Sequence, residues 1–564
     1  MAAFYSELIS ALKHRQLSAK QYDKLKLELV QKHKLNQVPT NIDVLLHCTP
    51  PDFPKLIPKL LSKPQRTISG VAPVAIMTKP FPCPHGRCIM CPGGVDSVFG
   101  DVPQSYTGRE PATMRGIRNN FDPYLQVFNR LEQYVLQGHN CDKVELIIMG
   151  GTFPSFPQEY QEEFVKYGFK AMNDFSKMFY DKHRTLNLVK FKRFFELPTD
   201  VDDELRVKRI QEKLLEIKKK CTLEQQQHIN ETAKIRCVAL CIETRPDYGT
   251  LKEGNEMLRL GCTRVELGIQ SVYDEVLKKI ERGHTTADTK NSIRILRDLG
   301  FKVAAHYMPG LPDNNFKRIS YRKDLAGMKQ LFSDSDYKPD MLKLYPCMVS
   351  RGTKLYSYYK KKKFIPLNAK EAAKLLVEFK KSVPEYCRIM RIQRDIPTAQ
   401  MTAGVEMTNL RQYMAQNYEV TCKCIRCREP KGREVEWKKV RLSLIKYTAS
   451  QGKEFFISAE DTEKNLLIGF IRMRFPSQVL RPEITKNSAL IRELHVYGTA
   501  TGIGDEGKVQ HRGWGKKLMQ KAEEIAKRAG KDKMVVISGV GAREYYRKLG
   551  YKLEGVYMVK KLYK

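Results

Sequence analysis

The 564-residue sequence contains no apolar run that approaches the roughly 20 residues needed to cross a bilayer. Its first residues lack the basic segment and apolar core that mark a secretory signal. No internal repeat or low-complexity tract is present either. These absences argue against a membrane-spanning protein, a secreted protein or a repeat array, and we expect a cytoplasmic location.

Acidic residues are scarce relative to basic ones. The chain has 63 Asp and Glu against 99 Lys and Arg, which gives a formal net charge of +36. Such an excess attracts a polyanion through long-range steering and counterion release. Nucleic acid, and RNA in particular, is therefore the leading predicted partner, with an acidic protein or lipid surface as the alternative.

The length predicts about three or four domains, and a hydrophobic content of 42% supports packed cores. We place their boundaries at residues 1–66, 67–385, 386–445 and 446–564. The first segment has helical spacing of leucines among lysines. It is either a basic helical RNA-binding arm or an N-terminal packing element.

From about residue 70, short apolar runs alternate with helical patterns, which predicts parallel strands joined by crossover helices. The runs are 144–149, 237–242, 265–269, 303–308 and 341–345. The expected class is α/β, with a closed or partial (β/α) barrel whose active site lies at the C-terminal strand ends. Segment 173–231 interrupts this rhythm as a charged helical insertion.

The last segment predicts a different architecture. Its runs at 454–458, 467–474 and 489–496 indicate an antiparallel meander. The expected elements that follow are a helix at 513–529, a strand at 534–538, a helix at 542–549 and a last strand at 551–559.

Fourteen cysteines in a chain without an export signal are expected to be reduced. Cys83, Cys88 and Cys91 lie in a loop rich in glycine and proline. Their spacing suits thiolates that hold three irons of a [4Fe–4S] cluster and leave the fourth iron open. A zinc knuckle with His85 as a further ligand is the alternative.

Three more cysteines, Cys422, Cys424 and Cys427, precede the last domain with gaps of one and two residues. This spacing suits a zinc ion, although a three-cysteine set lacks one ligand. Cys347, Cys387, a histidine or water would complete it, and a redox-labile reduced cluster is the alternative.

The stretch Gln510-His-Arg-Gly513-Trp-Gly515 directly precedes a helical pattern. Backbone N–H groups at a helix N-terminus bind pyrophosphate, and glycines permit close approach. Together with the strand 493–496 and the pair Tyr545 and Tyr546, the stretch resembles the N-acetyltransferase fold. The resemblance implies that the strand pairs with the pantetheine arm of acetyl-coenzyme A and that a tyrosine lies by the thioester.

The loop with Cys83 resembles that of the radical S-adenosylmethionine (SAM) enzymes, although the first gap is four residues instead of the usual three. In that superfamily, the open iron binds SAM and an electron cleaves it to a 5′-deoxyadenosyl radical. Gly150 and Gly151, after the first long strand, are the expected contacts of the cofactor's amino group. Three polar residues at later strand ends are further expected contacts: Glu243, Arg245 and Gln270.

Several phrases, including Met149-Gly-Gly-Thr-Phe153, Ile242-Glu-Thr-Arg-Pro-Asp247 and Arg492-Glu-Leu-His-Val-Tyr-Gly498, extend the resemblance from about residue 65 to the C-terminus. The chain resembles the family of Elongator catalytic subunits in their single-chain archaeal or bacterial form. The resemblance implies carboxymethylation of the wobble uridine of transfer RNA at C5. In that chemistry the radical removes a hydrogen from the acetyl methyl and the carbon radical adds to C5. The adduct then loses an electron, and thioester hydrolysis leaves a carboxymethyl group.

The same resemblance implies acetyl-coenzyme A contacts from both halves of the chain. They are Lys143, Glu493, Leu494, His495, Val496, Trp514, Gly515, Lys516 and Tyr546. Lys143 would reach the coenzyme across the domain interface and, with Tyr545 and Tyr546, form the expected catalytic set. Expected partners are the tRNA anticodon stem-loop and an electron donor, whereas other Elongator-type subunits are not required by the sequence.

Transfer RNA is expected to enter between the basic arm and the barrel mouth, because a wobble base must be splayed out to reach a buried radical. Arg109, Arg115, Arg118 and the run 360–363 are the basic residues considered for it. Two rival hypotheses remain. One is a protein lysine acetyltransferase with the barrel as scaffold, which the charge of +36 disfavours because basic tails are repelled. The other is a non-catalytic tRNA-binding assembly protein.

Overall fold

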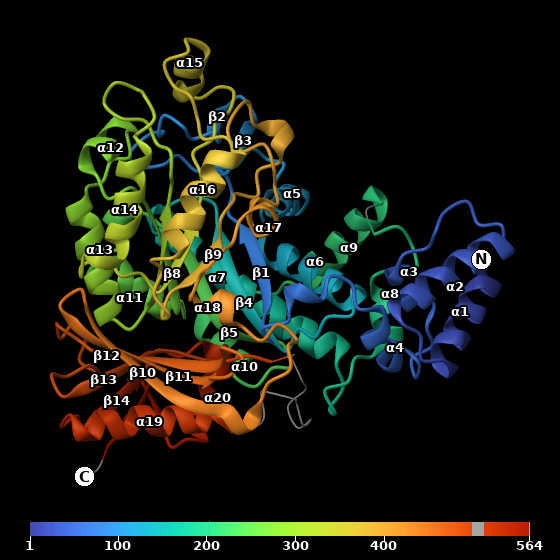
Figure 1. The fold of residues 1–564 in the computed structure, drawn as a ribbon. Coiled ribbons are helices and arrows are strands. Elements are labelled where there is room, and N and C mark those ends of the chain that lie inside the picture. The colour runs from blue at the N-terminus through green and yellow to red at the C-terminus, as the bar shows by residue number, and fades with distance from the viewer. Residues whose placement is uncertain (202, 499–512, 563–564) are drawn as a thin grey trace.

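The computed structural model describes residues 1–564 except 202, 499–512 and 563–564. Two seven-stranded sheets form the main body, and a small helical lobe lies beside it (Figure 1). No helix of the described residues combines the length and the apolar composition that crossing a membrane requires.

The lobe consists of the first four helices, which confirms the helical prediction for this segment. They are α1 (Ala2–His14), α2 (Ala19–Lys32), α3 (Asn41–His47) and α4 (Phe53–Leu60). The apolar face of α1 buries Phe4, Leu8 and Leu12. Lys192 of the main body donates hydrogen bonds to the carbonyls of Leu46 and Cys48, so the lobe is packed against its neighbour.

All strands of the first large sheet are parallel, in the order β1-β4-β5-β6-β7-β8-β9. They are β1 (Ala72–Met77), β4 (Lys143–Met149), β5 (Arg236–Thr244), β6 (Arg264–Gln270), β7 (Lys302–Tyr307), β8 (Met341–Leu344) and β9 (Arg388–Arg391). Strands β1 and β9 are both edges, so the sheet is a half-barrel and the predicted partial barrel is confirmed. The five predicted strands are β4 to β8; β1 and β9 were not predicted.

Helices surround this sheet, and a hairpin of β2 (Gly94–Ser97) and β3 (Gly100–Val102) lies near the cysteine loop. The helices are α5 (Pro111–Arg118), α6 (Pro123–Leu136), α7 (Gln158–Phe179), α8 (Leu188–Phe194), α9 (Glu204–Ile217), α10 (Leu223–Asn230), α11 (Leu251–Arg259), α12 (Asp274–Lys279), α13 (Thr286–Asp298), α14 (Tyr321–Ser333), α15 (Lys354–Lys360) and α16 (Ala369–Lys380).

The predicted insertion is helical in the structure and contains α8, α9, α10 and the last third of α7. Four buried rings pack together within it: Phe175, Phe179, Phe191 and Phe195. Helix α7 begins at Gln158, before the predicted start of the insertion, because its apolar face also packs against the half-barrel.

Helices α17 (Leu410–Asn417) and α18 (Ile425–Arg428) lead into the second large sheet, ordered β10-β11-β12-β13-β14-β16-β15. Its elements are β10 (Val440–Ala449), β11 (Gly452–Asp461), β12 (Leu466–Phe475), β13 (Ser488–Val496), α19 (Trp514–Arg528), β14 (Lys533–Val536), α20 (Arg543–Arg547), β15 (Lys552–Glu554) and β16 (Tyr557–Lys561).

The predicted meander is confirmed, with β10 as an additional first strand. The helix predicted at 513–529 is α19, and the helix at 542–549 is the shorter α20. The prediction of one last strand at 551–559 is wrong. Gly555, with a φ of 55°, turns the chain there, so β15 and β16 pair as an antiparallel hairpin.

The C-terminal domain packs against the starts of the half-barrel strands. A Cβ atom on Gly539 would lie 2.0 Å from the carbonyl oxygen of Val238, and one on Gly541 would lie 2.5 Å from Cβ of Arg236. Both contacts are with the first half of β5. The cysteine loop, by contrast, belongs to the opposite end, where the strands finish, and Figure 1 shows the second sheet beneath the half-barrel.

Candidate functional site

A cavity of about 1230 Å³ runs through the half-barrel and joins the two sequence motifs. Cys83, Cys88 and Cys91 line one end of it. Residues 493–497 of β13 and its extension line the other end. The two predicted chemistries therefore share one cavity, with the strands of the half-barrel among its walls.

The three loop cysteines are not gathered as tightly as the ligands of a single metal ion. A single zinc ion with Zn–S bonds of about 2.3 Å gathers its sulfurs within roughly 4 Å of one another. Among the described residues, only two groups of three such ligands lie within 4.8 Å of one another, and Cys83, Cys88 and Cys91 are not one of them. The donor set fits a [4Fe–4S] cluster better than the zinc-knuckle alternative.

Polar neighbours hold the cysteine sulfurs in place. His85 lies between two of them, with ring nitrogens 3.1 Å from Sγ of Cys83 and 3.2 Å from Sγ of Cys88. Nε2 of Gln104 donates to Sγ of Cys91 at 3.1 Å. Burial raises the pKa of Cys88 to about 11, so the thiolate requires a cation such as iron beside it.

Four of the predicted SAM contacts line the cavity near the cysteines: Gly151, Glu243, Arg245 and Gln270. Gln270 has a φ of 63°, which is strained for a residue with a side chain. Gly150 does not line the cavity. Its φ is 127°, and a Cβ atom there would lie 2.0 Å from Oγ1 of Thr78, so it permits the sharp turn after β4.

Arg282 is a site residue that the sequence reasoning missed. Its guanidinium lies 3.7 Å from Sγ of Cys88 and donates a 2.8 Å hydrogen bond to the carbonyl of Gly268. It lines the cavity beside the cysteine loop. Site residues were expected at the C-terminal ends of strands, and Arg282 instead follows helix α12. The sequence feature that could have indicated it is Glu281-Arg282-Gly283, a charged pair and a glycine directly after a helix.

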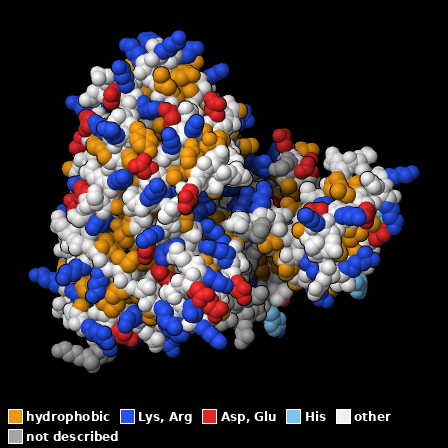
Figure 2. Space-filling view, viewed as in Figure 1, with side chains coloured by type: hydrophobic (Ala, Val, Ile, Leu, Met, Phe, Trp, Pro, Cys, Tyr) orange, Lys and Arg blue, Asp and Glu red, His pale blue; other side chains and the backbone are white. Residues whose placement is uncertain are grey.

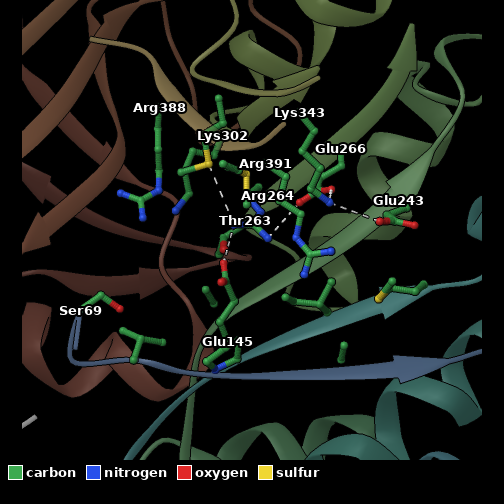
Figure 3. A pocket seen from close by; sticks show the side chains of 18 of the residues that line it. Ser69, Glu145, Glu243, Thr263, Arg264, Glu266, Lys302, Lys343, Arg388 and Arg391 are labelled. Carbon is green, nitrogen blue, oxygen red and sulfur yellow. Dashed lines mark hydrogen bonds and ion pairs between the residues drawn. The ribbon is translucent and has the colours of Figure 1, made fainter. Parts of the chain in front are cut away.

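Charged side chains line the interior of the half-barrel, where apolar layers are usual. The guanidinium of Arg264 lies 2.8 Å from the carboxylate of Glu145 and 3.0 Å from that of Glu266. Lys343 pairs with Glu266 from the other side, and its ammonium lies 3.5 Å from Glu243. Figure 3 shows this ionic ladder, which we define as Glu145, Arg264, Glu266, Lys343 and Glu243, along the cavity wall.

Lysine takes the place of a metal ion in this ladder. The ligand atoms of Glu243, Glu266 and His306 gather within 4.8 Å, as for a cation site. The ammonium of Lys343 already lies among them. Burial opposes ionisation of Glu266, but Lys343 and Arg264 hold its pKa well below the usual range, so this buried carboxylate is charged at neutral pH.

At the other end of the cavity, strand β13 has a free edge. It pairs with β14 from Ser488 to Ile491, and the pairing then stops although β13 continues to Val496. On its other side it remains paired with β12 up to Val496. The backbone of residues 493–496 is thus open on one edge and lines the cavity, which suits pairing with an extended amide chain.

Helix α19 points its N-terminus at the same region. Gly513 precedes it with a left-handed φ of 73° and no side chain caps its first N–H groups. Gly513, Gly515 and Lys516 line the cavity, whereas Trp514 packs against a small apolar cluster with Val440. Gln510 lies outside the described residues.

The two tyrosines differ in exposure, and both line the cavity. Tyr546 is 6% exposed and belongs to the core of the C-terminal domain, whereas Tyr545 is 40% exposed. A Cβ atom on Gly515 would lie 2.7 Å from the Tyr545 hydroxyl, so any larger residue there would require the tyrosine side chain to shift. Burial raises the pKa of Tyr545 to about 12, which keeps it a phenol at neutral pH.

Lys143 and His495 meet across the domain interface, and both line the cavity. Burial lowers the pKa of Lys143, and Arg236 acts in the same direction. Burial lowers the pKa of His495 to about 4, with contributions from Lys302, Arg388 and Lys143, so its ring is neutral at pH 7. The half-barrel thus adds positive charge to the acetyl end of the cavity.

Cys422, Cys424 and Cys427 do come together, with all three sulfurs within 4.8 Å. Sγ of Cys424 and Sγ of Cys427 are 3.6 Å apart. No fourth cysteine or histidine of the described chain joins this group, so neither Cys347 nor Cys387 completes it. The backbone N–H of Ile425 donates to the carbonyl of Cys387 at 2.9 Å, which ties the cysteine turn to the start of β9.

The half-barrel is open between β1 and β9, and the cavity is lined by both edges. On the β1 side, Arg66, Arg115 and Arg130 line it, and none of the three pairs with a carboxylate of the described residues. The guanidinium of Arg130 instead stacks 4.1 Å above the Tyr134 ring. Burial and the charge of Arg130 lower the pKa of Arg115 to about 10.

The β9 side of this opening is also basic. Arg388, Arg394, Arg426 and Lys431 line it. Burial and the neighbouring arginines lower the pKa of Arg426 to about 10, and burial with the charge of Arg426 lowers that of Lys431 to about 8. Positive groups close enough to lower one another's pKa create a positive potential that favours the binding of an anion. Figure 2 shows Lys and Arg side chains gathered in the hollow between the main body and the lobe.

The fold and this site together define a radical SAM half-barrel joined to a GNAT-type acetyltransferase domain. Family models agree: the Radical SAM superfamily matches residues 79–323, its C-terminal domain 339–419, and the Acetyltransferase (GNAT) family 419–551. A radical SAM domain implies a [4Fe–4S] cluster and SAM, and a GNAT domain implies acetyl-coenzyme A. The ELP3 N-terminal domain model matches residues 1–68.

The chain belongs to the Elongator complex protein 3 family. It is 45% identical to the tRNA uridine(34) acetyltransferase of Methanocaldococcus infernus, over 97% of this chain and 96% of that protein. It is 37% identical to Elongator complex protein 3 of Homo sapiens, over 99% of this chain and 95% of that protein. The solved structure of the M. infernus Elp3 lacking residues 1–46 matches with a TM-score of 0.70 and 40% identity, covering 88% of this chain and all of that one.

Proposed function

We propose that this chain converts the wobble uridine, uridine 34 of tRNA, to 5-carboxymethyluridine, using acetyl-coenzyme A and radical SAM chemistry. The observation that carries the proposal is the single cavity with the cysteine loop at one end and the open edge of β13 at the other. A radical and an acetyl group that enter from opposite ends meet inside the half-barrel. The relative named tRNA uridine(34) acetyltransferase supports the choice of substrate.

At the cysteine end, the chain's own residues bind and orient the cofactors. Cys83, Cys88 and Cys91 hold the cluster, and Arg282 stabilises the thiolate of Cys88. Four residues bind SAM: Gly151, Glu243, Arg245 and Gln270. When bound, the cluster and SAM supply a carbon radical able to remove a hydrogen from the acetyl methyl. Gly150 acts indirectly, by allowing the turn that exposes the backbone of Gly151.

At the acetyl end, the backbone of residues 493–496 pairs with the pantetheine arm, and the N-terminus of α19 binds the pyrophosphate with Lys516. Lys143 adds positive charge from the half-barrel. The phenol of Tyr545 donates a hydrogen bond to the thioester carbonyl, and Tyr546 supports its ring from the core. Trp514 acts by packing the start of α19 against its domain.

Transfer RNA enters at the open edge between β1 and β9. The guanidinium groups of Arg66, Arg115 and Arg130 on one side, and of Arg426 on the other, form no ion pair with a described carboxylate, and they bind the phosphates next to the target nucleotide. The uracil then passes between them into the cavity. Stacked arginine and aromatic groups such as Arg130 and Tyr134 suit unstacked bases as well as phosphates.

We also propose that Cys422, Cys424 and Cys427 bind a zinc ion, whose fourth ligand is water or another molecule. A zinc ion here would fix the turn that connects the half-barrel to the C-terminal domain. Metal analysis of the purified protein and of a Cys424→Ser variant tests this. We expect one zinc per chain in the wild type and its loss in the variant; equal zinc in both would refute the assignment.

The experiment for the main proposal is an anaerobic incubation of cluster-loaded protein with tRNA, methyl-labelled acetyl-coenzyme A, SAM and dithionite. Nucleoside mass spectrometry should detect labelled 5-carboxymethyluridine. Cys88→Ser should abolish it, because the cluster is lost. Cys221→Ser, at a half-buried cysteine away from the cavity, is the matched control and should retain it.

Two outcomes would replace the proposal. Label on protein lysines instead of tRNA would indicate a protein lysine acetyltransferase. Binding of tRNA with neither SAM cleavage nor label transfer would indicate a tRNA-binding assembly protein. The position of the acetyl end in the same cavity as the cysteine loop disfavours the first outcome, since a protein tail would have to enter between the two domains.

A further inference from the structure

Helix α15 projects from the main body at the end of the half-barrel that carries the cysteine loop (Figure 1). The segment 351–365 contains Arg351, Lys354 and the run 360–363, and it contains no acidic residue. All four lysines of the run are exposed, and none forms an ion pair with a described carboxylate. Only Lys354 is neutralised, by Glu281 at 2.7 Å. The tip of this segment is therefore strongly positive.

This tip is physically connected to the cysteine loop. The backbone N–H of Leu355 in α15 donates a 2.8 Å hydrogen bond to the carbonyl of Ile89, which lies between Cys88 and Cys91. Leu355 and Phe364 are fully buried in a small apolar cluster that also contains both cysteines and is separate from the main core. A molecule bound to the outer surface of α15 is thus separated from the cysteine ligands of the cluster only by this helix.

Apolar groups accompany the charge. Ile365 is 68% exposed and Val98, on the turn of the β2–β3 hairpin, is 64% exposed. Val98 packs against Gly352, where an added Cβ would lie 2.4 Å from its side chain, so hairpin and α15 form one cap. The ring of Tyr358 stacks 3.5 Å from that of Phe316, which stiffens the tip. Exposed apolar side chains within a rim of charge are the mark of a protein-docking surface.

We propose that this cap, defined as Val98, Lys354 and residues 360–365, is the docking surface for an acidic one-electron carrier protein that reduces the cluster. The inference rests on the proposed function, in which SAM cleavage requires that one electron first be delivered to the cluster. The transfer moves one electron from the reduced carrier, which is oxidised, to the cluster, which is reduced; no bond or proton is exchanged. Electron-transfer partners meet through small, transient interfaces guided by opposite charge, which suits a protruding tip.

A run of lysines could also bind RNA, but the structure offers a more suitable RNA-binding surface elsewhere. The open edge between β1 and β9 offers partly buried arginines, one of them stacked on an aromatic ring, that line the cavity itself. The cap offers exposed lysines around apolar side chains, at the end of the half-barrel next to the cysteines. The planar guanidinium of arginine binds phosphate through two parallel hydrogen bonds, whereas the ammonium of lysine is a compact point charge that attracts carboxylates without a fixed geometry.

The test compares two electron sources in the same cluster-loaded protein. In one variant, Lys360, Lys361, Lys362 and Lys363 are all changed to Gln. The matched control removes four exposed charges from the C-terminal domain: Lys527→Gln, Arg528→Gln, Lys552→Gln and Lys561→Gln. The probes are dithionite and an acidic flavodoxin kept reduced by its reductase and NADPH. The readout is the second-order rate of cluster reduction, followed by absorbance at low ionic strength.

We expect the cap variant to be reduced by flavodoxin about tenfold more slowly than the wild type and the control, with the difference vanishing at high salt. Reduction by dithionite, SAM cleavage with dithionite and tRNA affinity should be unchanged. Equal flavodoxin rates, or a loss of tRNA affinity with intact flavodoxin rates, would overturn the proposal. Failure of the dithionite reaction in the wild type would instead refute the proposed function.

A second measurement needs neither a variant nor a cluster. Carbodiimide joins a lysine directly to a carboxylate in salt-bridge contact. With oxidised flavodoxin and the wild-type chain, mass spectrometry should find crosslinks at residues 360–363 more often than at Lys527 or Lys552. Crosslinks spread evenly over the exposed lysines would contradict a docking site on the cap.

Discussion

The guanidinium of Arg492, on strand β13, donates hydrogen bonds of 2.7 Å to both carboxylate oxygens of Asp340, the residue before strand β8. Both side chains are completely buried at the interface between the half-barrel and the C-terminal domain. Arg472 continues the network, since it lies 3.5 Å from Asp340 and 2.8 Å from Glu493. The open edge of β13 begins at Glu493, so this network fixes the acetyl end of the cavity relative to the half-barrel.

Asp340→Asn should strongly destabilise the interface. The variant leaves Arg492 and Arg472 buried without the carboxylate that both face, and breaking a buried pair in this way costs about 3–5 kcal/mol. We expect a thermal midpoint lowered by roughly 10 °C, measured by differential scanning fluorimetry. The control is Asp336→Asn, whose carboxylate is partly exposed and 3.8 Å from Lys290. A shift as small as that of the control would show that the network does not hold the domains together.

Lys143→Met should weaken the binding of acetyl-coenzyme A, because it removes a positive charge that the half-barrel contributes to the acetyl end. A charge-assisted contact is worth about 1.5–3 kcal/mol, which corresponds to a loss of roughly tenfold or more in affinity. Isothermal titration with coenzyme A measures it. Lys182→Met, at an exposed lysine away from the cavity, should bind normally. Unchanged affinity and coenzyme hydrolysis in the Lys143 variant would remove this residue from the site.

Gly515→Ala should displace Tyr545. The new Cβ would lie 2.7 Å from the tyrosine hydroxyl and 3.9 Å from Val496. We expect loss of acetyl-coenzyme A binding while SAM cleavage with dithionite persists, because the cysteine end of the cavity is untouched. Adding Tyr545→Phe removes the clashing oxygen and should restore binding, although not hydrolysis. If Gly515→Ala alone binds normally, the close approach of Tyr545 is unimportant for the coenzyme.

Much of the fold was predictable because apolar strand residues alternate with amphipathic helices. Strands β4 to β8 follow from this pattern. Strand β1 was not predicted, because its run 72–77 contains Pro73 and precedes the cysteine loop, and the four-residue β9 carries arginine at both ends. Strand β10 alternates buried and exposed positions so weakly that its pattern does not stand out.

The residues of the site could be predicted only where they belong to a recognisable sequence motif. The cysteines, the glycines and the tyrosines all follow from short phrases that the family shares. The ionic ladder does not, since Glu266 lies within, and Arg264 directly before, the run 265–269 that was interpreted as an apolar strand. The signal of a polar interior was the pair of charged residues two positions apart in this strand, together with Lys343 in the middle of another apolar run. Trp514 shows the reverse error, since the motif includes it but its ring packs away from the cavity.

Arg130→Gln should reduce tRNA binding through the loss of one phosphate contact at the open edge. We expect the slope of log affinity against log salt to fall by about one and the loss to be similar for all tRNA sequences. Filter binding at several salt concentrations measures both. Arg528→Gln on the outer face of α19 is the control and should leave the slope unchanged. An unaltered slope for the Arg130 variant would move RNA entry away from the β1 edge.

Lys343→Met should make the stability of the half-barrel depend on pH. In the wild type, Lys343 and Arg264 hold the pKa of Glu266 well below its usual value despite burial, so the carboxylate stays charged above pH 5. Without the lysine, we expect burial to outweigh the remaining attraction of Arg264 and His306, so that the pKa of Glu266 rises above its unfolded value of about 4.3. A raised folded-state pKa stabilises at low pH and loses that stability as pH rises through it.

The thermal midpoint of the Lys343→Met variant should therefore fall as pH increases from 5 to 8, more steeply than that of the wild type. Adding Glu266→Gln removes the titrating group and should restore the wild-type profile, even if the midpoint itself stays lower. A Lys290→Met variant, at a half-buried lysine paired with Asp334 at 2.9 Å, tests whether loss of any lysine has this effect. If the single and double variants share one pH profile, Glu266 is not the buried charge that Lys343 stabilises.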